Sequence, residues 1–403
     1  MNALPTPPKR SHQARSLANS LRILDAAEAV LADDGWEDAS VLRIAEHAGV
    51  SRRAVLHRYG DRTGVVIDVW RRRLAPVLIS ALESLVMALS PEGASLTGAD
   101  IDGALRPFID PVSPMRAASE VLIISCHQPD VRAAVTISLA DHLSRWLEPS
   151  GRRLSRTAAA RHGFVVSLAL GMLLESREYP DGLDLDLRDD LEIIAGALMV
   201  DITAKQLPVN RADFLETTPT LHEDLGLNTL LAATLTLVGE LGYESATIDR
   251  ISAACGVTSG FVYGHYPNKR SLFLDATFRL LLHAESQSAE FRRQITAEHG
   301  PGIADATLLR ELMRPEFHQV RTITFEQYRL AWHDPGFLDA FVAVRQQVIA
   351  AVHESEPHLS RPRARGRAFI AMSRGAGSGM LAELWPQSYA LPHDVIARPL
   401  AGE

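Results

Sequence analysis

The strongest constraint in this sequence is an internal repeat. Shifting the chain by 207 residues places residues 35–65 on residues 242–272 without a gap, and 9 of these 31 pairs are identical. With small changes of offset the match continues, since Glu120 falls on Glu326 at 206 and Gly171 on Gly379 at 208. Repeated sequence indicates a repeated structural unit, so the chain is expected to fold as two copies of a unit of about 200 residues.

Each repeat begins with the apolar stripe of an amphipathic helix, in which apolar residues recur every three to four positions. In the first repeat the stripe ends at Gly35 and consists of Ile23, Leu24, Ala27, Val30 and Leu31. The second repeat has its stripe before Gly242, made of Leu230, Leu231, Thr234, Leu237, Val238 and Leu241. Both stripes predict a helix that a glycine terminates.

Two short helices are predicted after each stripe. Ser and Thr are favoured N-caps, and a glycine between two helices permits positive φ in a tight turn. The cap, turn and cap positions are Ser40, Gly49 and Ser51 in the first repeat, and Thr247, Gly256 and Thr258 in the second. Helix, turn with glycine, helix is the helix-turn-helix arrangement. Strand signals are almost absent elsewhere, so the predicted fold class is all-α.

With these residues, each repeat resembles the tetracycline-repressor-like (TetR) family of transcriptional regulators over about 45 residues. The family pattern runs from a glycine and an aromatic residue to a final Asn or Asp and Lys or Arg. The second repeat follows it from Gly242 to its end at Tyr263, His265, Tyr266, Asn268 and Lys269. The first repeat departs from it at Leu56, where the family has Tyr, and at Arg53, where small residues are usual.

The third helix of each repeat is expected to present its outer face to a DNA major groove. In the first repeat Val55 and Tyr59 form the inward stripe, which leaves Arg52, Arg53 and His57 outside. The matching face of the second repeat carries Ser259, Gly260 and Tyr263. Phosphate contacts implied by the resemblance fall on Arg58, Arg62, His265 and Lys269, with the helix N-termini at Ser40, Ser51, Thr247 and Thr258.

Local charge favours the first repeat as the stronger DNA binder. The whole chain has a formal net charge of −8 at pH 7, which disfavours a general polyanion-binding protein. Residues 1–73 hold 12 basic and 9 acidic side chains, whereas residues 228–283 hold 4 of each. The first 20 residues are read as a flexible basic arm, which either stays in solvent or follows the DNA backbone or minor groove.

Beyond the helix-turn-helix segments, the resemblance implies helical effector domains with an internal ligand pocket and dimerisation through the last two helices. The first repeat has such a pair around residues 158–175 and 187–205, whereas the last helix of the second repeat is shortened or missing. Close helix packing explains the glycines at 375, 377 and 379 better than a phosphate loop does. The expected boundaries are 1–20 arm, 21–73 and 227–283 helix-turn-helix domains, 74–206 and 284–403 effector domains, and 207–226 linker.

Other functional classes find little support. No nucleophile elbow, zinc-protease or Walker motif occurs, and the 15 histidines and two cysteines show no metal-ligand spacing, so neither catalysis, metal nor cofactor is expected. The longest uncharged apolar stretch, residues 164–174, is shorter than the roughly 20 residues of a membrane span. Residues 1–15 lack the apolar core of a secretory signal, so a cytoplasmic location without membrane contact is expected.

The sequence thus predicts a tandem transcriptional regulator that binds a double-stranded DNA operator. We expect a repressor that releases DNA when a small apolar or amphipathic effector binds. Two assemblies remain open: one chain acting as an intrachain pseudo-dimer, or a homodimer of tandem chains. The alternative function is a ligand-binding or protein-interaction module in which one or both helix-turn-helix segments no longer contact DNA.

Overall fold

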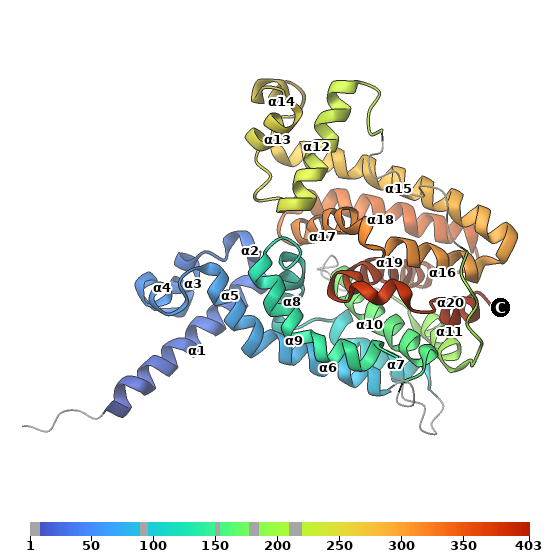
Figure 1. Cartoon of the computed structure of the whole chain (residues 1–403), viewed down its shortest axis with the longest axis horizontal. Helices are drawn as coiled ribbons and strands as arrows, with labels where there is room; N and C mark the ends of the chain where they lie inside the picture. Colours follow the sequence, from blue (N-terminus) through green and yellow to red (C-terminus); the bar gives the residue numbers. More distant parts are fainter. Residues whose placement is uncertain (1–8, 89–95, 150–153, 177–184, 209–219) are drawn as a thin grey trace, which may run out of the picture. The chain divides into compact units, whose positions relative to one another are not determined.

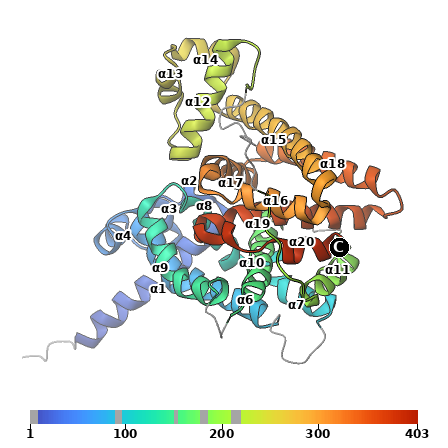
Figure 2. The same cartoon turned by 45° about the vertical axis from the view of Figure 1, so that its right-hand side comes forward.

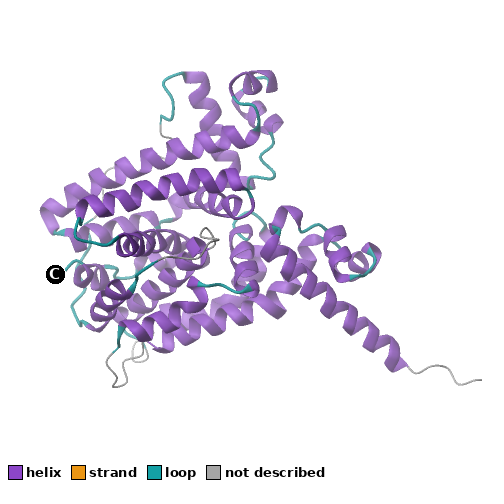
Figure 3. Cartoon of the chain, turned by 180° about the vertical axis from the view of Figure 1, so that it is seen from behind, coloured by secondary structure: helices purple, strands orange, loops and turns teal. Residues whose placement is uncertain are grey.

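The computed structural model describes residues 9–88, 96–149, 154–176, 185–208 and 220–403. Every regular element in these ranges is helical, and Figure 3 shows them as helices joined by loops. The expected all-α class is therefore confirmed. The chain divides into two compact units, residues 1–78 with 112–138 and residues 79–111 with 139–403. This division cuts across the expected boundary at 206, because residues 139–206 group with the second repeat.

The first compact unit contains the first helix-turn-helix and the helices that cover it (Figure 1). Its elements are α1 (Lys9–Asp33), α2 (Gly35–Asp38), α3 (Val41–Ala48), α4 (Arg52–Tyr59), α5 (Arg62–Val69), the π-helical η1 (Trp70–Leu74), α8 (Ser113–Ile124), and the first residues of α6 (Ala75–Ala88) and α9 (Pro129–Leu147). Helix α1 packs against α3, α5 and α8. Ile23, Leu24 and Val30 on its inner face are buried, as the apolar stripe predicts.

The N-terminal segment differs from the expected flexible arm. Helix α1 begins at Lys9, so residues 9–20 are helical, while residues 1–8 lie outside the described part of the chain. No proline or glycine interrupts this stretch, and Ser20 is buried with its Oγ donating to Ser16 O at 2.8 Å. The helix is therefore continuous with the apolar stripe that follows, because nothing in the sequence stops it.

The second compact unit holds the second helix-turn-helix and most of the long helices. Its elements are α7 (Gly98–Ile109), α10 (Arg156–Ser176), α11 (Arg188–Met199), α12 (Leu225–Leu241), α13 (Ile248–Cys255), α14 (Ser259–His265), α15 (Lys269–His299), α16 (Pro301–Leu312), η2 (Pro315–Phe317), α17 (His318–His333), α18 (Pro335–Ser355), α19 (Arg361–Leu384), η3 (Pro386–Ala390) and α20 (Asp394–Leu400), with the remainder of α6 and α9.

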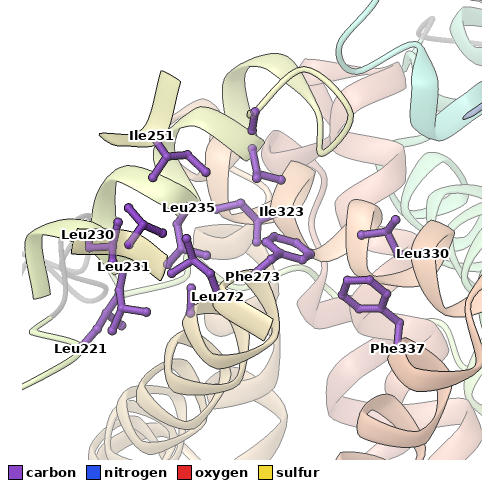
Figure 4. Packing of buried hydrophobic residues seen from close by; sticks show 14 of the residues in the cluster. Leu221, Leu230, Leu231, Leu235, Ile251, Leu272, Phe273, Ile323, Leu330 and Phe337 are labelled. Carbon is purple, nitrogen blue, oxygen red and sulfur yellow. The ribbon is translucent and has the colours of Figure 1, made fainter. Parts of the chain in front are cut away.

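A hydrophobic cluster holds the second helix-turn-helix to the helices behind it (Figure 4). Leu230 and Leu235 from α12 and Ile251 from α13 are buried in it, together with Phe273 from α15. Ile323 and Leu330 from α17 and Phe337 from α18 complete the cluster. Since these helices share one continuous core, the helix-turn-helix segment of this repeat is packed on α17 and α18 and is not connected to them by the chain alone.

Helices α10 and α19 pack closely along each other, and they lie together in both views (Figures 1 and 2). A Cβ atom placed on Gly171 would collide with the backbone of Ser373, and one on Gly377 with the backbone of Ser167. The interpretation as a close-packing residue is thus confirmed for Gly377, whereas it is wrong for Gly375, which is exposed and has no atom within 4 Å of an added Cβ. Helix α10 is long and apolar enough to cross a membrane, but 72% of its most apolar 18-residue window is buried in the protein, as in a core helix.

The C-terminal helices of the two repeats end differently from the expected bounds. In the first repeat α11 ends at Met199 instead of Lys205, because Val200 is already extended. The backbone N–H of Lys205 instead donates to Asp394 Oδ2 at 2.7 Å. In the second repeat α20 spans 7 residues, against 12 in α11. The linker expected at 207–226 ends at Leu225, where α12 begins, and its residues 209–219 lie outside the described ranges.

Candidate nucleic-acid interface

Side-chain caps fix the first helix-turn-helix. Ser40 accepts a hydrogen bond from Arg43 N at 3.1 Å and starts α3, while Ser51 accepts one from Ala54 N at 3.2 Å and starts α4. Between them Gly49 has a φ of 61°, a left-handed conformation that glycine adopts without a steric cost. The expected caps and turn are therefore confirmed, and they set the angle at which α4 leaves α3.

The second helix-turn-helix has the same local structure. Thr247 accepts from Arg250 N and Thr258 from Phe261 N, both at 3.3 Å, and Gly256 has a φ of 68°. Val262 on α14 is buried, as Val55 is on α4. The repeat detected in the sequence is thus a repeat of structure down to the individual caps.

The outer face of α4 is cationic. Arg52, Arg53, His57 and Arg58 are all exposed, and Arg58 Nη1 donates to Ser16 Oγ of α1 at 3.2 Å. Within the described ranges neither Arg52 nor Arg53 forms an ion pair or a side-chain hydrogen bond. Because a guanidinium group presents a planar fork of N–H donors, both side chains can bind a guanine edge or a phosphate.

The outer face of α14 has a different chemistry. Tyr263 is 57% exposed and Gly260 is open to solvent, but the Ser259 hydroxyl donates to Asp249 Oδ1 at 2.9 Å. His265 Nδ1 donates to Phe261 O at 2.9 Å. The Asp249 carboxylate therefore engages the Ser259 hydroxyl, which was expected to contact DNA bases. It also places a negative charge beside this face, whereas the first repeat has the apolar Leu42 at the matched position. Anionic DNA is bound less favourably by such a face.

Arg62 and Lys269, two of the expected phosphate ligands, also have a structural role. The Arg62 guanidinium lies 3.8 Å from the Trp36 ring centroid, and its Nη1 donates to Trp36 O at 2.9 Å. Lys269 Nζ lies 4.0 Å from the Tyr243 ring centroid and donates to Tyr243 O at 2.8 Å. Both cations thus secure the turn after the first helix of their repeat, and contact with phosphate stays a prediction for them.

Two buried glutamates that were not among the expected functional residues complete this arrangement. Trp36 N donates to Glu120 Oε1 at 2.8 Å, and Tyr243 N donates to Glu326 Oε2 at 3.2 Å. Glu120 on α8 and Glu326 on α17 are at most 1% exposed. They connect the first part of the helix-turn-helix segment to α8 in the first repeat and to α17 in the second. The signal was present in the sequence, because these two glutamates match at an offset of 206.

Comparisons with known proteins single out the same two segments. The family model of bacterial regulatory proteins of the tetR family matches residues 23–69 and again residues 230–276. The HTH-type transcriptional regulator BetI of Serratia proteamaculans (strain 568) is 35% identical over 72 residues, and BetI of Ectopseudomonas mendocina (strain ymp) is 38% identical over 72 residues. Each match covers 18% of this chain and 36% of the relative, so the chain spans about a third of the length of these curated relatives.

Proposed function

Since this chain belongs to the tetR family through two tandem units, we propose that it is a transcriptional regulator that binds double-stranded DNA sequence-specifically. The observation that carries the proposal is the capped helix-turn-helix whose second helix, α4, exposes Arg52, Arg53, His57 and Arg58 together. Arginines at the start of such a helix can read base edges in the major groove, and neighbouring cations position it on the phosphates. No chemistry beyond binding is assigned to the protein, which we expect to act in the cytoplasm.

We further propose that one chain acts as its own dimer. Reciprocal contacts between α10 and α19 support this: Gly171 approaches Ser373, while Gly377 approaches Ser167. Ser167 and Ser373 are 206 residues apart, as are Gly171 and Gly377, so the two contacts are equivalent in spacing, although the best sequence match of these helices aligns Gly171 with Gly379. Such self-complementary contact is typical of a two-fold interface between subunits. A homodimer of tandem chains is the competing assembly.

An intrachain pseudo-dimer with two different recognition helices is expected to select an asymmetric DNA site. A palindromic operator mirrors a true two-fold axis. The two recognition helices lack this symmetry, because the first begins with Arg52 and Arg53 where the second has Ser259 and Gly260. Selection of bound duplexes from random DNA by the full-length protein, followed by sequencing, tests this. An enriched asymmetric motif is the expected result. A palindrome would instead indicate two chains that read DNA with the same repeat, and no enrichment would contradict DNA recognition itself.

The double substitution Arg52→Ala with Arg53→Ala is expected to weaken specific binding far more than Ser259→Ala. Each bidentate arginine contributes about 1–3 kcal/mol of discrimination, which corresponds to a loss of roughly 10-fold or more in affinity. Ser259 is already hydrogen-bonded to Asp249, so its removal should change affinity little. Gel-shift titrations on the selected site measure both. Equal losses for the two variants would contradict the assignment of base reading to α4.

The runner-up function, an interaction module without DNA contact, has specific support only in the second repeat. There the Asp249 carboxylate lies beside the start of α14 and engages Ser259. Titration of affinity against salt separates the alternatives, because every phosphate contact steepens the fall of log affinity with log salt. A steep slope that shrinks after Arg58→Ala and survives His265→Ala would restrict DNA binding to the first repeat.

We propose a ligand-responsive repressor as the regulatory mode. An effector would act by binding one conformation of the helical domains more tightly than another, since equal affinity shifts no equilibrium. Glu120 and Glu326 supply the physical link, because each ties an effector helix to the backbone just after the first helix of its DNA-binding domain. A shift of α8 or α17 would therefore move the attached helix-turn-helix.

A further inference from the structure

Leu42, in the first turn of α3, is an apolar side chain that the fold leaves outside the core. Ile44 and Ala45 on the inner side of the same helix are buried, whereas 53% of Leu42 is exposed. Its neighbour Arg43 is ion-paired within the unit, since Arg43 Nη2 donates to Asp34 Oδ2 at 3.0 Å. More than half of the leucine side chain is thus open to a partner outside this unit.

The second repeat shows where a side chain at this position lies. Leu42 matches Asp249 and Arg52 matches Ser259, both at the offset of 207. Asp249 Oδ1 accepts a hydrogen bond from the Ser259 hydroxyl at 2.9 Å, so position 249 lies beside the first residue of α14. The two segments share their caps and their left-handed glycine, and α3 packs on α4 as α13 packs on α14. Leu42 therefore lies beside Arg52 at the start of α4.

An apolar neighbour leaves the start of α4 open to DNA. A leucine side chain accepts no hydrogen bond, so Leu42 cannot engage the Arg52 guanidinium group as a carboxylate would. One turn further along α3, Glu46 is exposed and acidic. Because that carboxylate repels phosphate, DNA is expected to approach α3 closely only at its first turn. The contact surface there consists of one apolar group and one cation side by side.

Building on the proposed DNA recognition by α4, we propose that Leu42 selects a thymine through contact with its C5-methyl group. The thymine methyl is the apolar group of the major-groove base edges, and apolar side chains contact it, whereas arginine pairs with guanine. Successive base pairs are about 3.4 Å apart along the DNA axis, so neighbouring side chains reach bases within about two pairs of each other. The thymine of Leu42 therefore lies within about two base pairs of the guanine that Arg52 contacts.

The differences between the repeats limit this selection to one part of the DNA site. At the matched position Asp249 is charged and already engaged with Ser259, so it offers no apolar surface to a methyl group. The second repeat is therefore expected to select no thymine from this position. Selection by Leu42 occurs once per chain although the helix-turn-helix occurs twice.

Deoxyuridine tests the proposal, because it pairs as thymidine does and lacks only the C5-methyl group. In the DNA site selected by the full chain, each thymine is replaced in turn and affinity is measured by fluorescence anisotropy. We expect a roughly 4-fold loss at the thymine of Leu42, since a buried methyl group contributes about 0.8 kcal/mol. The guanine of Arg52 is located with 7-deazaguanine, which lacks the N7 acceptor, as the guanine whose replacement no longer matters in Arg52→Ala.

Substitutions of Leu42 assign the methyl contact to this side chain. Leu42→Ala should abolish the loss caused by deoxyuridine, whereas Leu42→Met keeps an apolar side chain and should retain it. Because Leu42 is exposed and alanine favours helix, Leu42→Ala is expected to fold, and Leu42→Gln provides a second polar test. Val112→Ala is the matched control, since Val112 is an exposed apolar residue of the same unit outside the helix-turn-helix. This control should leave the loss unchanged.

The outcomes distinguish this inference from DNA recognition itself. If no thymine near the guanine of Arg52 responds to deoxyuridine, selection by Leu42 is overturned while DNA binding by the chain stands. The same holds if the loss persists in Leu42→Ala and Leu42→Gln. If the full chain selects no DNA site at all, DNA recognition is contradicted, and the role of Leu42 with it.

Discussion

Gly377→Ala is expected to destabilise the protein, although alanine is normally the better helix former. A Cβ at this position would collide with Ser167 O and the backbone of Gly171, and backbone atoms cannot rotate away as a side chain can. Helices α10 and α19 would therefore have to separate along their contact. Overpacking of this kind costs about 1–3 kcal/mol, which exceeds the roughly 0.5–1 kcal/mol that alanine gains over glycine in a helix.

Gly375→Ala provides a matched control on the same helix. Gly375 is exposed, and a Cβ placed there meets no atom within 4 Å. The same chemical change should therefore raise the melting temperature slightly at 375 and lower it at 377. Thermal unfolding followed by circular dichroism measures both. If the two variants melted alike, the close approach of the two repeats along α10 and α19 would be incorrect.

Arg345→Met is expected to cost about 3–5 kcal/mol of stability, because it leaves a buried carboxylate without its cation. Glu175, at the end of α10, is fully buried and accepts hydrogen bonds from Tyr328 of α17 and Arg345 of α18. The Arg345 guanidinium also lies 4.1 Å from the Phe341 ring centroid. The ion pair between Glu175 and Arg345 thus connects a helix of the first repeat to one of the second. Gly171 and Gly377 instead connect the repeats by allowing close packing of α10 and α19.

A double-mutant cycle separates the ion pair from simple loss of packing. Glu175→Gln combined with Arg345→Met removes both charges, so it should be markedly less destabilising than Arg345→Met alone. Chemical denaturation of the three variants and the parent gives the coupling. Additive losses would show that the two charges do not interact.

The effect of Arg345→Met should also depend on pH. Burial raises the pKa of Glu175 above its ordinary value, against the opposing charge of Arg345, and removal of Arg345 should raise it further. The folded variant then binds a proton more readily than the unfolded chain, so its stability falls as pH rises above the ordinary glutamate value of about 4.3. The destabilisation should therefore be larger at pH 7 than at pH 5.

The helix-turn-helix segments could be predicted almost residue by residue, because their signals are local. The capping hydroxyls of Ser40, Ser51, Thr247 and Thr258 act within three residues, and Gly49 and Gly256 set a single backbone angle each. The start of α1 could not be predicted in the same way, because no such local signal marks it. The sequence between Lys9 and Ser20 contains no strong helix start and predicts an arm, whereas the structure makes it the first part of α1.

The sequence by itself determined the all-α class, the two-fold repeat and both helix-turn-helix motifs, since periodicity, caps and turn glycines express short-range forces. Only the tertiary structure decided that α10 packs on α19, that Arg62 and Lys269 stack on Trp36 and Tyr243, and that Asp249 engages Ser259. These features depend on which distant surfaces meet, and burial changes the free energy of a charge far more than its neighbours in sequence do.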